Sequence, residues 1–333
     1  MWITHRTLRY SLSVNFFELL FPDFSLILLG WLLCRHTPLD RSLWQRVESL
    51  VYYLLFPILL FQSILKTPLQ IGPLTGLIGA AWMLSILMVV SSYILPRLPG
   101  IGAPMRTSEG LRGHAAAAQI GFRFNSFIAL GISDRVAGPQ GLALAAVLIG
   151  FCVPLYNVAA VWPMHRQMQR DSAGGVDGES SSFLRELLKN PLIIATVSAT
   201  LLNLAGFRIP ELLATPFTRL GNASLALGLM AAGAGLQLTA LHSVKILAVA
   251  QLSIKHLLAP LAACALAWAA GLPPAQATAL LLFAATPTSP NGYVLASKMG
   301  FDGAPVAAMI TLSTVLGLFS LPFGLALASW LHP

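Results

Sequence analysis

The chain has 333 residues, of which 56% are hydrophobic and only 10% charged, and its mean hydropathy is +0.75. A soluble globular domain carries about a quarter charged residues, so this composition excludes one and indicates an integral membrane protein in contact with the lipid bilayer. The formal net charge of +8 does not indicate nucleic acid as a partner, because basic residues in a membrane protein mark the loops that face the cytoplasm.

Hydrophobic runs of about 20 residues, the length that crosses the hydrocarbon core as a helix, recur along the chain. The first run is interrupted by Glu18 and Asp23, and the fourth holds Arg123. The residues before the first run lack a signal-peptide cleavage site and are interpreted as a tail. The ten predicted spans are 14–34, 47–65, 73–95, 112–135, 138–164, 187–206, 212–240, 246–271, 274–298 and 304–331.

A polar segment, QRDSAGGVDGESSS at 169–182, is predicted to be a flexible linker. It divides the chain into two halves of five spans, 1–168 and 183–333. Because five is odd, each half ends on the opposite side of the membrane from its start. Two similar halves would therefore form inverted repeats.

An internal echo supports such a repeat. Asn125-Ser126-Phe127-Ile128 is matched by Asn291-Gly292-Tyr293-Val294, which lies 166 positions later (291 − 125). A proline follows in the next span of each half, at Pro154 and Pro322. This spacing is the kind of evidence that internal repeats leave in a sequence.

Lysine and arginine counts predict the orientation, because basic residues concentrate in cytoplasmic loops. With both termini outside and the linker in the cytoplasm, the inner loops hold twice as many of these residues as the outer side. The inner residues are Arg35, Arg41, Arg46, Arg97, Arg106, Arg112, Arg166, Arg170, Arg185, Lys189, Lys245 and Lys298. The outer residues are Arg6, Arg9, Lys66, Arg135, Arg208 and Arg219.

The ninth span is broken by the stretch AATPTSPNGYVL at 284–295. Pro287 and Pro290 lack an N–H and clash with the preceding turn, so carbonyls near Phe283 and Thr286 lose their helical partners. Unpaired backbone groups are costly in lipid, and the break must therefore face protein or water. Pro290 and Asn291 suit the start of a new helix.

The fourth span has a comparable break in QIGFRFNSFIALG, where Asn125 is again placed as a helix cap. In inverted repeats the two breaks would cross near the middle of the membrane, with two helix N-termini facing one site. Such a site favours an anion. The predicted substrate-binding residues are Arg123, Asn125, Ser126, Thr286, Thr288, Ser289 and Asn291, with Gly121, Pro287 and Pro290 forming the crossover.

Two further ionisable residues, Lys255 and His256, lie inside the eighth span and are candidates for coupling. Lys255 is ten residues into its span, about 15 Å of helix, and intramembrane charges are functional hypotheses by default. His256 titrates near neutrality when unperturbed, although a packed core histidine is the alternative. For Arg123 the alternative is a side chain that snorkels to the interface.

Other features of the sequence predict structure or an absence of chemistry. The small residues Gly228, Ala231, Ala232 and Gly235 are typical of a close helix-packing face. The three cysteines lie in apolar runs and are predicted to be free buried thiols. We predict no cofactor and no metal site. No acidic residue lies near either break, which disfavours a sodium site, although backbone carbonyls alone could hold an ion.

The chain resembles the auxin efflux carrier family of secondary transporters, which includes plant PIN-type carriers and bacterial organic-acid permeases. Ordered pieces from about Phe21 onward carry the resemblance. These pieces are LVYYLLFPILLF, FRFNSFIALG, LKNPLIIA, LGNASLALGLMAAGAGLQL, IKHLLAPL and NGYVLASKMGFDGAPVAAMITLSTVLGLFSLP.

The resemblance implies ten spans in two inverted repeats, with broken spans four and nine crossing at the substrate. It also implies a scaffold of spans one, two, six and seven, usually dimeric, beside an elevator-like unit of the other six. Members often have two small residues beside the first-half asparagine, whereas here Arg123 stands two residues before it. This difference suits a dicarboxylate better than a bulky aromatic acid, and a bacterial inner membrane is the expected location.

The functional prediction is therefore a secondary carrier of small organic anions, with carboxylates expected, that works by alternating access. The alternative within transport is a sodium-coupled symporter of the bile-acid type. A membrane enzyme is not expected, because the sequence lacks HExxH, GxSxG and a pair of intramembrane acids. A passive receptor or scaffold would gain nothing from charges at two symmetric breaks.

Overall fold

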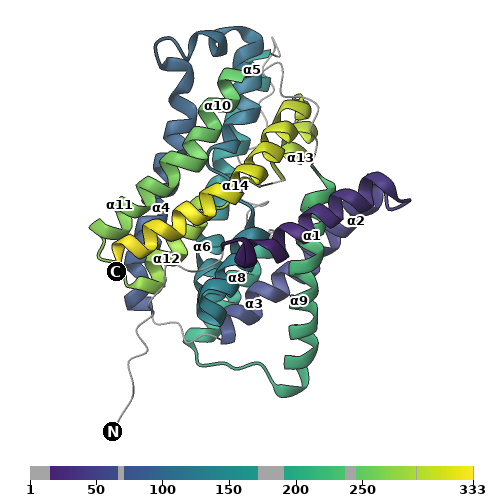
Figure 1. Ribbon diagram of the computed structural model, residues 1–333, viewed down its shortest axis with the longest axis vertical. Coiled ribbons are helices and arrows are strands. Elements are labelled where there is room, and N and C mark those ends of the chain that lie inside the picture. Colours follow the sequence, from purple (N-terminus) through teal and green to yellow (C-terminus); the bar gives the residue numbers. More distant parts are fainter. Residues whose placement is uncertain (1–15, 67–70, 172–190, 237–244, 290, 333) are drawn as a thin grey trace.

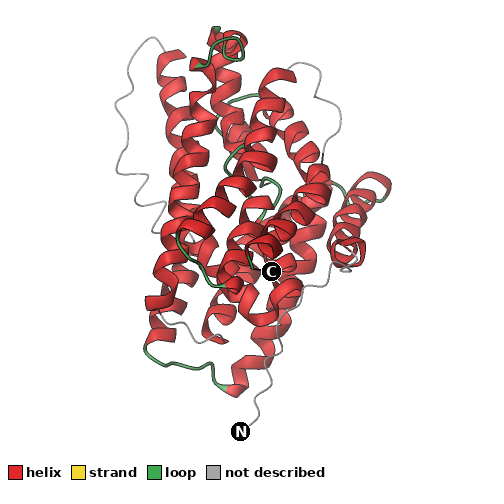
Figure 2. Ribbon diagram, turned by 60° about the vertical axis from the view of Figure 1, so that its left-hand side comes forward, coloured by secondary structure: helices red, strands yellow, loops and turns green. Residues whose placement is uncertain are grey.

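The computed structural model describes residues 16–66, 71–171, 191–236, 245–289 and 291–332. This described part consists of helices and connecting loops and contains no strand (Figure 2). The predicted all-helical class is therefore confirmed. Residues 172–182 of the predicted linker, and Pro290, lie outside the described residues.

The helices follow one another along the chain in the order below, where η marks a short 3₁₀ or π-helical turn. They are α1 (Phe16–His36), α2 (Arg41–Leu50), η1 (Val51–Leu55), α3 (Phe56–Lys66), α4 (Ile71–Ile94), η2 (Leu95–Arg97), η3 (Ala103–Arg106), α5 (Ser108–Ala117), η4 (Ala118–Ile120), α6 (Ser126–Asp171), α8 (Pro191–Leu204), α9 (Glu211–Ala234), α10 (Lys245–Ser253), η6 (Ile254–Leu258), α11 (Ala259–Ala269), α12 (Pro274–Ala285), α13 (Asn291–Lys298) and α14 (Gly303–Leu331).

Within the described ranges, four helical segments are long and apolar enough to cross a bilayer. They are Leu74–Arg97, Ser126–Met168, Ile246–Ala269 and Gly303–Leu331. Two shorter apolar helices, Phe24–His36 and Pro274–Ala285, accompany them. These helices identify an integral membrane protein. The count of ten spans stays a prediction.

Helix α6 contains a sharp bend at Ala137 and Gly138, where the backbone leaves helical geometry. Gly138 has φ 57°, a conformation that glycine adopts without the Cβ clash of other residues. The predicted boundary between the fourth and fifth spans falls at this bend. Helix α6 continues to Asp171, so residues 169–171 of the predicted linker are helical, and the linker itself stays a prediction.

The helices form two groups (Figure 1). In one group α1 packs along α9, and α3 packs against both α8 and α9. In the other, α12 packs against α6, α11 and α14, and α4 packs against α6 and α11. The first group contains the helices of predicted spans one, two, six and seven. Helix α6 of the second group also contacts α1, α3, α8 and α9, and the assignment of scaffold and transport unit stays a prediction.

Glycines allow α1 and α9 to approach backbone to backbone. A Cβ added at Gly30 of α1 would lie 1.9 Å from the Met230 carbonyl oxygen, and one added at Gly233 of α9 would lie 1.8 Å from that of Ile27. Such contact is typical of membrane helices, whose association depends on close van der Waals packing. Gly228, which belongs to the predicted small-residue face, makes a different contact: a Cβ there would lie 2.4 Å from the Phe127 ring.

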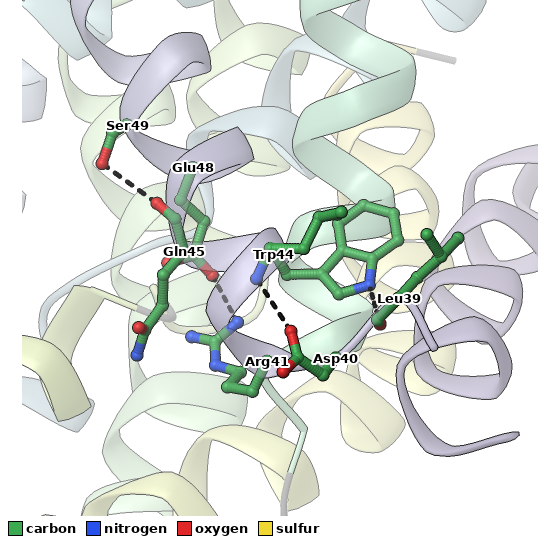
Figure 3. A network of polar contacts seen from close by, with 8 residues as sticks. Leu39, Asp40, Arg41, Trp44, Gln45, Glu48 and Ser49 are labelled. Atoms are coloured by element: carbon green, nitrogen blue, oxygen red, sulfur yellow. Dashed lines mark hydrogen bonds and ion pairs between the residues drawn. The ribbon is translucent and has the colours of Figure 1, made fainter. Parts of the chain in front are cut away.

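Helix α2 begins at a capped N-terminus, shown in Figure 3. The Asp40 carboxylate accepts a hydrogen bond from the Leu43 N–H at 3.1 Å, which lowers the pKa of Asp40. Trp44 donates its indole N–H to the Leu39 carbonyl at 3.0 Å, and Arg41 pairs with Glu48 at 2.7 Å. These contacts fix the start of the continuous helical stretch α2–η1–α3.

We predict that Gly30→Val or Gly233→Val prevents the packing of α1 on α9, because each added side chain would occupy the space of the partner's backbone. The measurement is the yield of monodisperse protein in detergent and its thermal stability. Gly79→Val is the matched control, since a Cβ at Gly79 meets nothing within 4 Å. Equal yields for all three variants would contradict the packing described.

Candidate functional site

Two helical interruptions lie side by side in the structure. Residues 121–125 are non-helical between η4 and α6, and residues 286–289 are non-helical between α12 and α13. The Asn125 N–H donates to the Pro287 carbonyl at 2.6 Å. The Gln119 side-chain amide donates to the Gly292 carbonyl at 3.0 Å. The prediction that the two segments meet is therefore confirmed.

The carbonyl groups at the end of α12 receive donors from outside their own helix. Lys255 Nζ donates to Ala284 O at 3.2 Å, and Ser320 Oγ donates to Ala285 O at 2.7 Å. The backbone N–H of Asn125 donates to the carbonyl of Pro287, two residues beyond the end of the helix. Each of these carbonyls would be unpaired and costly where α12 stops inside the membrane. The donors come from η6, α14 and the first interruption, so this helix end joins three parts of the fold.

His256 and two serines of α14 form a closed hydrogen-bond chain around the second interruption. Ser313 Oγ accepts from the Thr288 N–H at 2.9 Å and lies 2.8 Å from His256 Nε2. His256 Nδ1 lies 2.9 Å from Ser320 Oγ, which donates to Ala285 O. Because the Ser320 proton is committed to Ala285, His256 must donate from Nδ1. Its Nε2 then accepts from Ser313, and a neutral imidazole satisfies the whole chain.

Asn125 caps α6, as its position in the sequence predicts. Its Oδ1 accepts from the Phe127 N–H at 3.0 Å and from the Ile128 N–H at 3.3 Å. Capping satisfies amides that have no partner in the first helical turn. Ser126 is the first residue of α6 and is partly buried. The N-terminal end of α6, with its partial positive charge, therefore lies at the junction of the two interruptions.

Arg123 is buried beside this junction, with 9% of its surface exposed. One terminal nitrogen of its guanidinium donates to Asn157 Oδ1 at 3.0 Å, and its Nε has no hydrogen-bond partner among the described residues. The described ion pairs, Arg41 with Glu48 and Arg112 with Asp171, do not include it. Its burial removes the alternative that it snorkels to an exposed interface.

Aromatic side chains also hold the first interruption in place. Phe122 and Phe124 alternate with Arg123 and Asn125 along the chain. Phe124 contacts Phe283 of α12 with ring centroids 4.3 Å apart, and Phe122 lies 5.6 Å from Tyr156. These ring contacts anchor the first interruption against α12 and α6.

The other predicted residues of the second interruption are also buried. Thr286 donates its hydroxyl to Leu282 O at 2.6 Å, so this proton is used within α12. Thr288 Oγ1 has no partner among the described residues, and Ser289 is 9% exposed. Asn291 is the first residue of α13, but its side chain lies outside the described part.

The crossover residues Gly121 and Pro287 occupy tight positions. A Cβ at Gly121 would lie 2.3 Å from Ser92 Oγ and 2.5 Å from Gln251 Oε1. A Cβ at Gly317 of α14 would lie 2.3 Å from Pro287 Cγ, so this glycine makes room for the proline ring. Both interruptions are therefore packed against neighbouring helices rather than against lipid.

Sequence reasoning missed four polar residues of this site, namely Gln119, Asn157, Ser313 and Ser320. Each is a polar residue in an otherwise apolar helical run, which is a signal in a membrane protein. Ser313 and Ser320 are also seven positions apart, which puts both hydroxyls on one face of α14. Their partners could be assigned only from the packed structure.

Comparison with known families agrees with the chain's architecture. Residues 179–325 match the family described as "Membrane transport protein". This match confirms the predicted resemblance to the auxin efflux carrier family over residues 179–325, and such a match implies a secondary membrane transporter. The matched range contains the second interruption, Lys255 and His256, whereas Arg123 and Asn125 lie before it. A comparison with curated proteins finds no significant match.

We predict that Ser320→Ala lowers stability by about 1–3 kcal/mol, because it leaves buried groups of Ala285 and His256 without a partner. Ser329→Ala in the same helix is the matched control, since its hydroxyl lies at an exposed position and bonds only locally to Ala326 O at 2.8 Å. Thermal unfolding in detergent compares them. An equal change in both variants would show that the chain of hydrogen bonds around His256 adds no stability.

Proposed function

We propose that this secondary membrane transporter carries small organic anions, namely carboxylates, and binds them where the two interruptions meet. The observation that carries the proposal is the Arg123 guanidinium. It is buried, it contacts the neutral Asn157 at 3.0 Å, and its Nε has no partner among the described residues. A buried cation without a carboxylate partner is costly, and an anionic substrate removes that cost when it binds.

The surroundings of Arg123 favour an anion over a cation. The N-terminal end of α6 begins at Ser126, directly after the cap at Asn125. Helix N-termini stabilise negative charge through free amides and the helix dipole. The planar fork of arginine matches the two oxygens of a carboxylate, which gives orientation as well as charge. Arg123 therefore supplies the counter-charge, and Asn125 caps the helix whose N-terminal end faces the proposed site.

The second interruption supplies the neutral part of the proposed site. Thr288 Oγ1 is buried, at 1% exposure, and has no partner among the described residues, so it is available to a substrate oxygen. Ser289 and Asn291 are proposed to orient the anion with it. Gln119 joins the two segments through Gly292 O and has an Oε1 without a described partner. These groups favour a compact, oxygen-rich substrate such as a dicarboxylate.

The two helix groups support an elevator form of alternating access. We propose that α1, α2–α3, α8 and α9 form a static scaffold and homodimer interface, and that the remaining helices carry the site. Contacts between the groups include Phe56 against Phe127, with ring centroids 4.7 Å apart. Every hydrogen bond described above joins residues within one group. A largely apolar boundary permits sliding without breaking polar contacts at each cycle.

The membrane arrangement completes the proposal. Ten spans in two inverted repeats would place the interruptions of 121–125 and 286–289 at symmetric positions. The charge counts favour both termini outside and the linker in the cytoplasm of a bacterial inner membrane. Tagging both termini and testing their accessibility in right-side-out vesicles examines this orientation.

We predict that Arg123→Ala abolishes carboxylate binding while the protein still folds, because the site loses its counter-charge. A thermal-shift screen of acetate, lactate, succinate and benzoate on purified protein measures binding, and uptake into proteoliposomes measures transport. Arg166→Ala is the matched control, since this arginine lies over the exposed Trp162 ring at 4.8 Å. Unchanged uptake by the Arg123→Ala variant would remove Arg123 from the site.

We also predict that Asn157→Asp weakens carboxylate binding about tenfold or more, because an aspartate within 3.0 Å of the guanidinium would compensate its charge. The same substitution is expected to raise thermal stability by pairing a buried cation. Asn157→Leu separates the effects, since it removes the hydrogen bond without adding charge. Tighter carboxylate binding by Asn157→Asp would contradict the electrostatic role given to Arg123.

A further inference from the structure

Lys255 lies at the carbonyl end of α12. Its side chain is buried, at 3% exposure, and its Nζ donates to Ala284 O at 3.2 Å. A helix C-terminus carries partial negative charge and exposes carbonyl oxygens, so this position attracts a cation. In a transporter driven by a metal cation, such oxygens are suitable ligands for the ion. Here the Lys255 amino group of the protein itself occupies the position.

The described surroundings of Lys255 contain no carboxylate. Helices α4, α10, α11, α12 and α14 pack against η6, and none of them carries an aspartate or glutamate. The titratable groups on these elements and on η6 are Tyr93, Lys245, His256 and Cys264. Of these, the Tyr93 hydroxyl donates to Ala159 O at 2.8 Å. In such surroundings the charged ammonium form of Lys255 is costly unless an anion lies nearby. Without an anion, the neutral amine is the favoured form.

The backbone connects Lys255 to the proposed anion site. Ala284, whose carbonyl binds Lys255, is three residues before Pro287. The Pro287 carbonyl accepts from Asn125, two residues after Arg123. An anion bound at Arg123 therefore adds negative charge at the same junction. Its arrival favours the protonated form of Lys255, and its departure favours the neutral amine.

His256 is the neighbouring alternative, but its hydrogen bonds commit it to structure. Both ring nitrogens contact serines of α14, and the neutral imidazole completes the chain from Thr288 N–H to Ala285 O. An added proton at Nε2 would leave the Ser313 hydroxyl without its acceptor. Lys255, by contrast, uses one of its three N–H donors in the described contact. The proton that moves is therefore assigned to Lys255.

We propose that the Lys255 ammonium is the coupling cation of this carrier and stands in place of a metal ion. This inference rests on the proposed function and adds its energy source. The neutral amine takes a proton from water on the side where the anion enters, through a new N–H bond to its lone pair. The protonated carrier moves with its anion. On the other side the anion leaves and the proton returns to water, so one proton travels with each anion.

The test is uptake of radiolabelled acetate, lactate, succinate and benzoate into proteoliposomes, assayed in parallel, with the membrane potential held at zero. Undissociated acetic, lactic and benzoic acid also cross lipid unaided and accumulate with a pH gradient, so protein-free liposomes give the baseline. Above that baseline we expect about tenfold accumulation for each pH unit of inward gradient, most clearly for succinate, since one proton accompanies each anion. A sodium gradient is expected to have no effect. Absence of uptake for all four anions would contradict the proposed function itself, whereas uptake that ignores the pH gradient would overturn only this inference.

Lys255→Arg provides the sharpest variant. Arginine keeps the positive charge and can still donate to Ala284 O, but it does not release a proton in proteins. We expect exchange of internal for external anion to remain measurable, while accumulation driven by the pH gradient is lost. A purely structural role for Lys255 would reduce both activities together. Accumulation by Lys255→Arg that still follows the pH gradient would overturn the proposal.

His256→Gln is the control for the neighbouring group, because glutamine keeps hydrogen-bonding capacity without titrating near neutrality. We expect this variant to retain accumulation driven by the pH gradient, at a reduced rate if the interruption loosens. Loss of that accumulation in His256→Gln, with retention in Lys255→Arg, would place the proton on His256 and contradict the assignment. Sodium-driven accumulation by the unmodified carrier would show that a metal ion couples transport instead.

Discussion

The structure depends on how the carbonyl end of α12 is satisfied inside an apolar protein. The helix stops at Ala285, ahead of Pro287, and in lipid its last carbonyls would remain unpaired at high cost. Lys255 and Ser320 donate to its last two carbonyls, and the backbone N–H of Asn125 donates to the Pro287 carbonyl just beyond them. The interruption is therefore possible only because η6, α14 and the first interruption converge on it.

The same contacts bring chemistry to the middle of the molecule. A lysine and a histidine, adjacent in the π-helical turn η6, serve neighbouring carbonyls, Lys255 directly and His256 through Ser320. π-Helical turns are rare in proteins, and those that occur are frequently found at functional sites. The same residues therefore donate hydrogen bonds to the end of α12, directly or through Ser320, and place ionisable side chains beside it. A substitution there is expected to affect folding and transport together, which is why charge-conserving variants discriminate best.

Close packing keeps the two helix groups distinct. Gly30 and Gly233 let α1 and α9 touch through their backbones, whereas the boundary with the other group is lined by rings such as Phe56 and Phe127. Backbone contact gives a rigid pair, because it has a single well-fitting arrangement. Apolar contact between side chains is less specific in register. This contrast is the physical basis for the proposal that one group is static and the other moves.

Much of the site is readable in the sequence because it depends on local chemistry. Pro287 and Pro290 lack the backbone N–H groups that would continue α12, and Asn125 caps the helix that directly follows it. The apolar composition likewise determined membrane insertion and the all-helical class, since lipid leaves the backbone few alternatives.

Only the tertiary structure decided which distant groups complete these local features. Arg123 hydrogen-bonds Asn157, which is 34 residues away in the sequence. His256 contacts Ser313 and Ser320, which are 57 and 64 residues away. In the sequence these residues are isolated polar positions with several possible partners. Their choice is made by helix packing, because a hydrogen bond requires a distance of about 3 Å that only the folded chain sets.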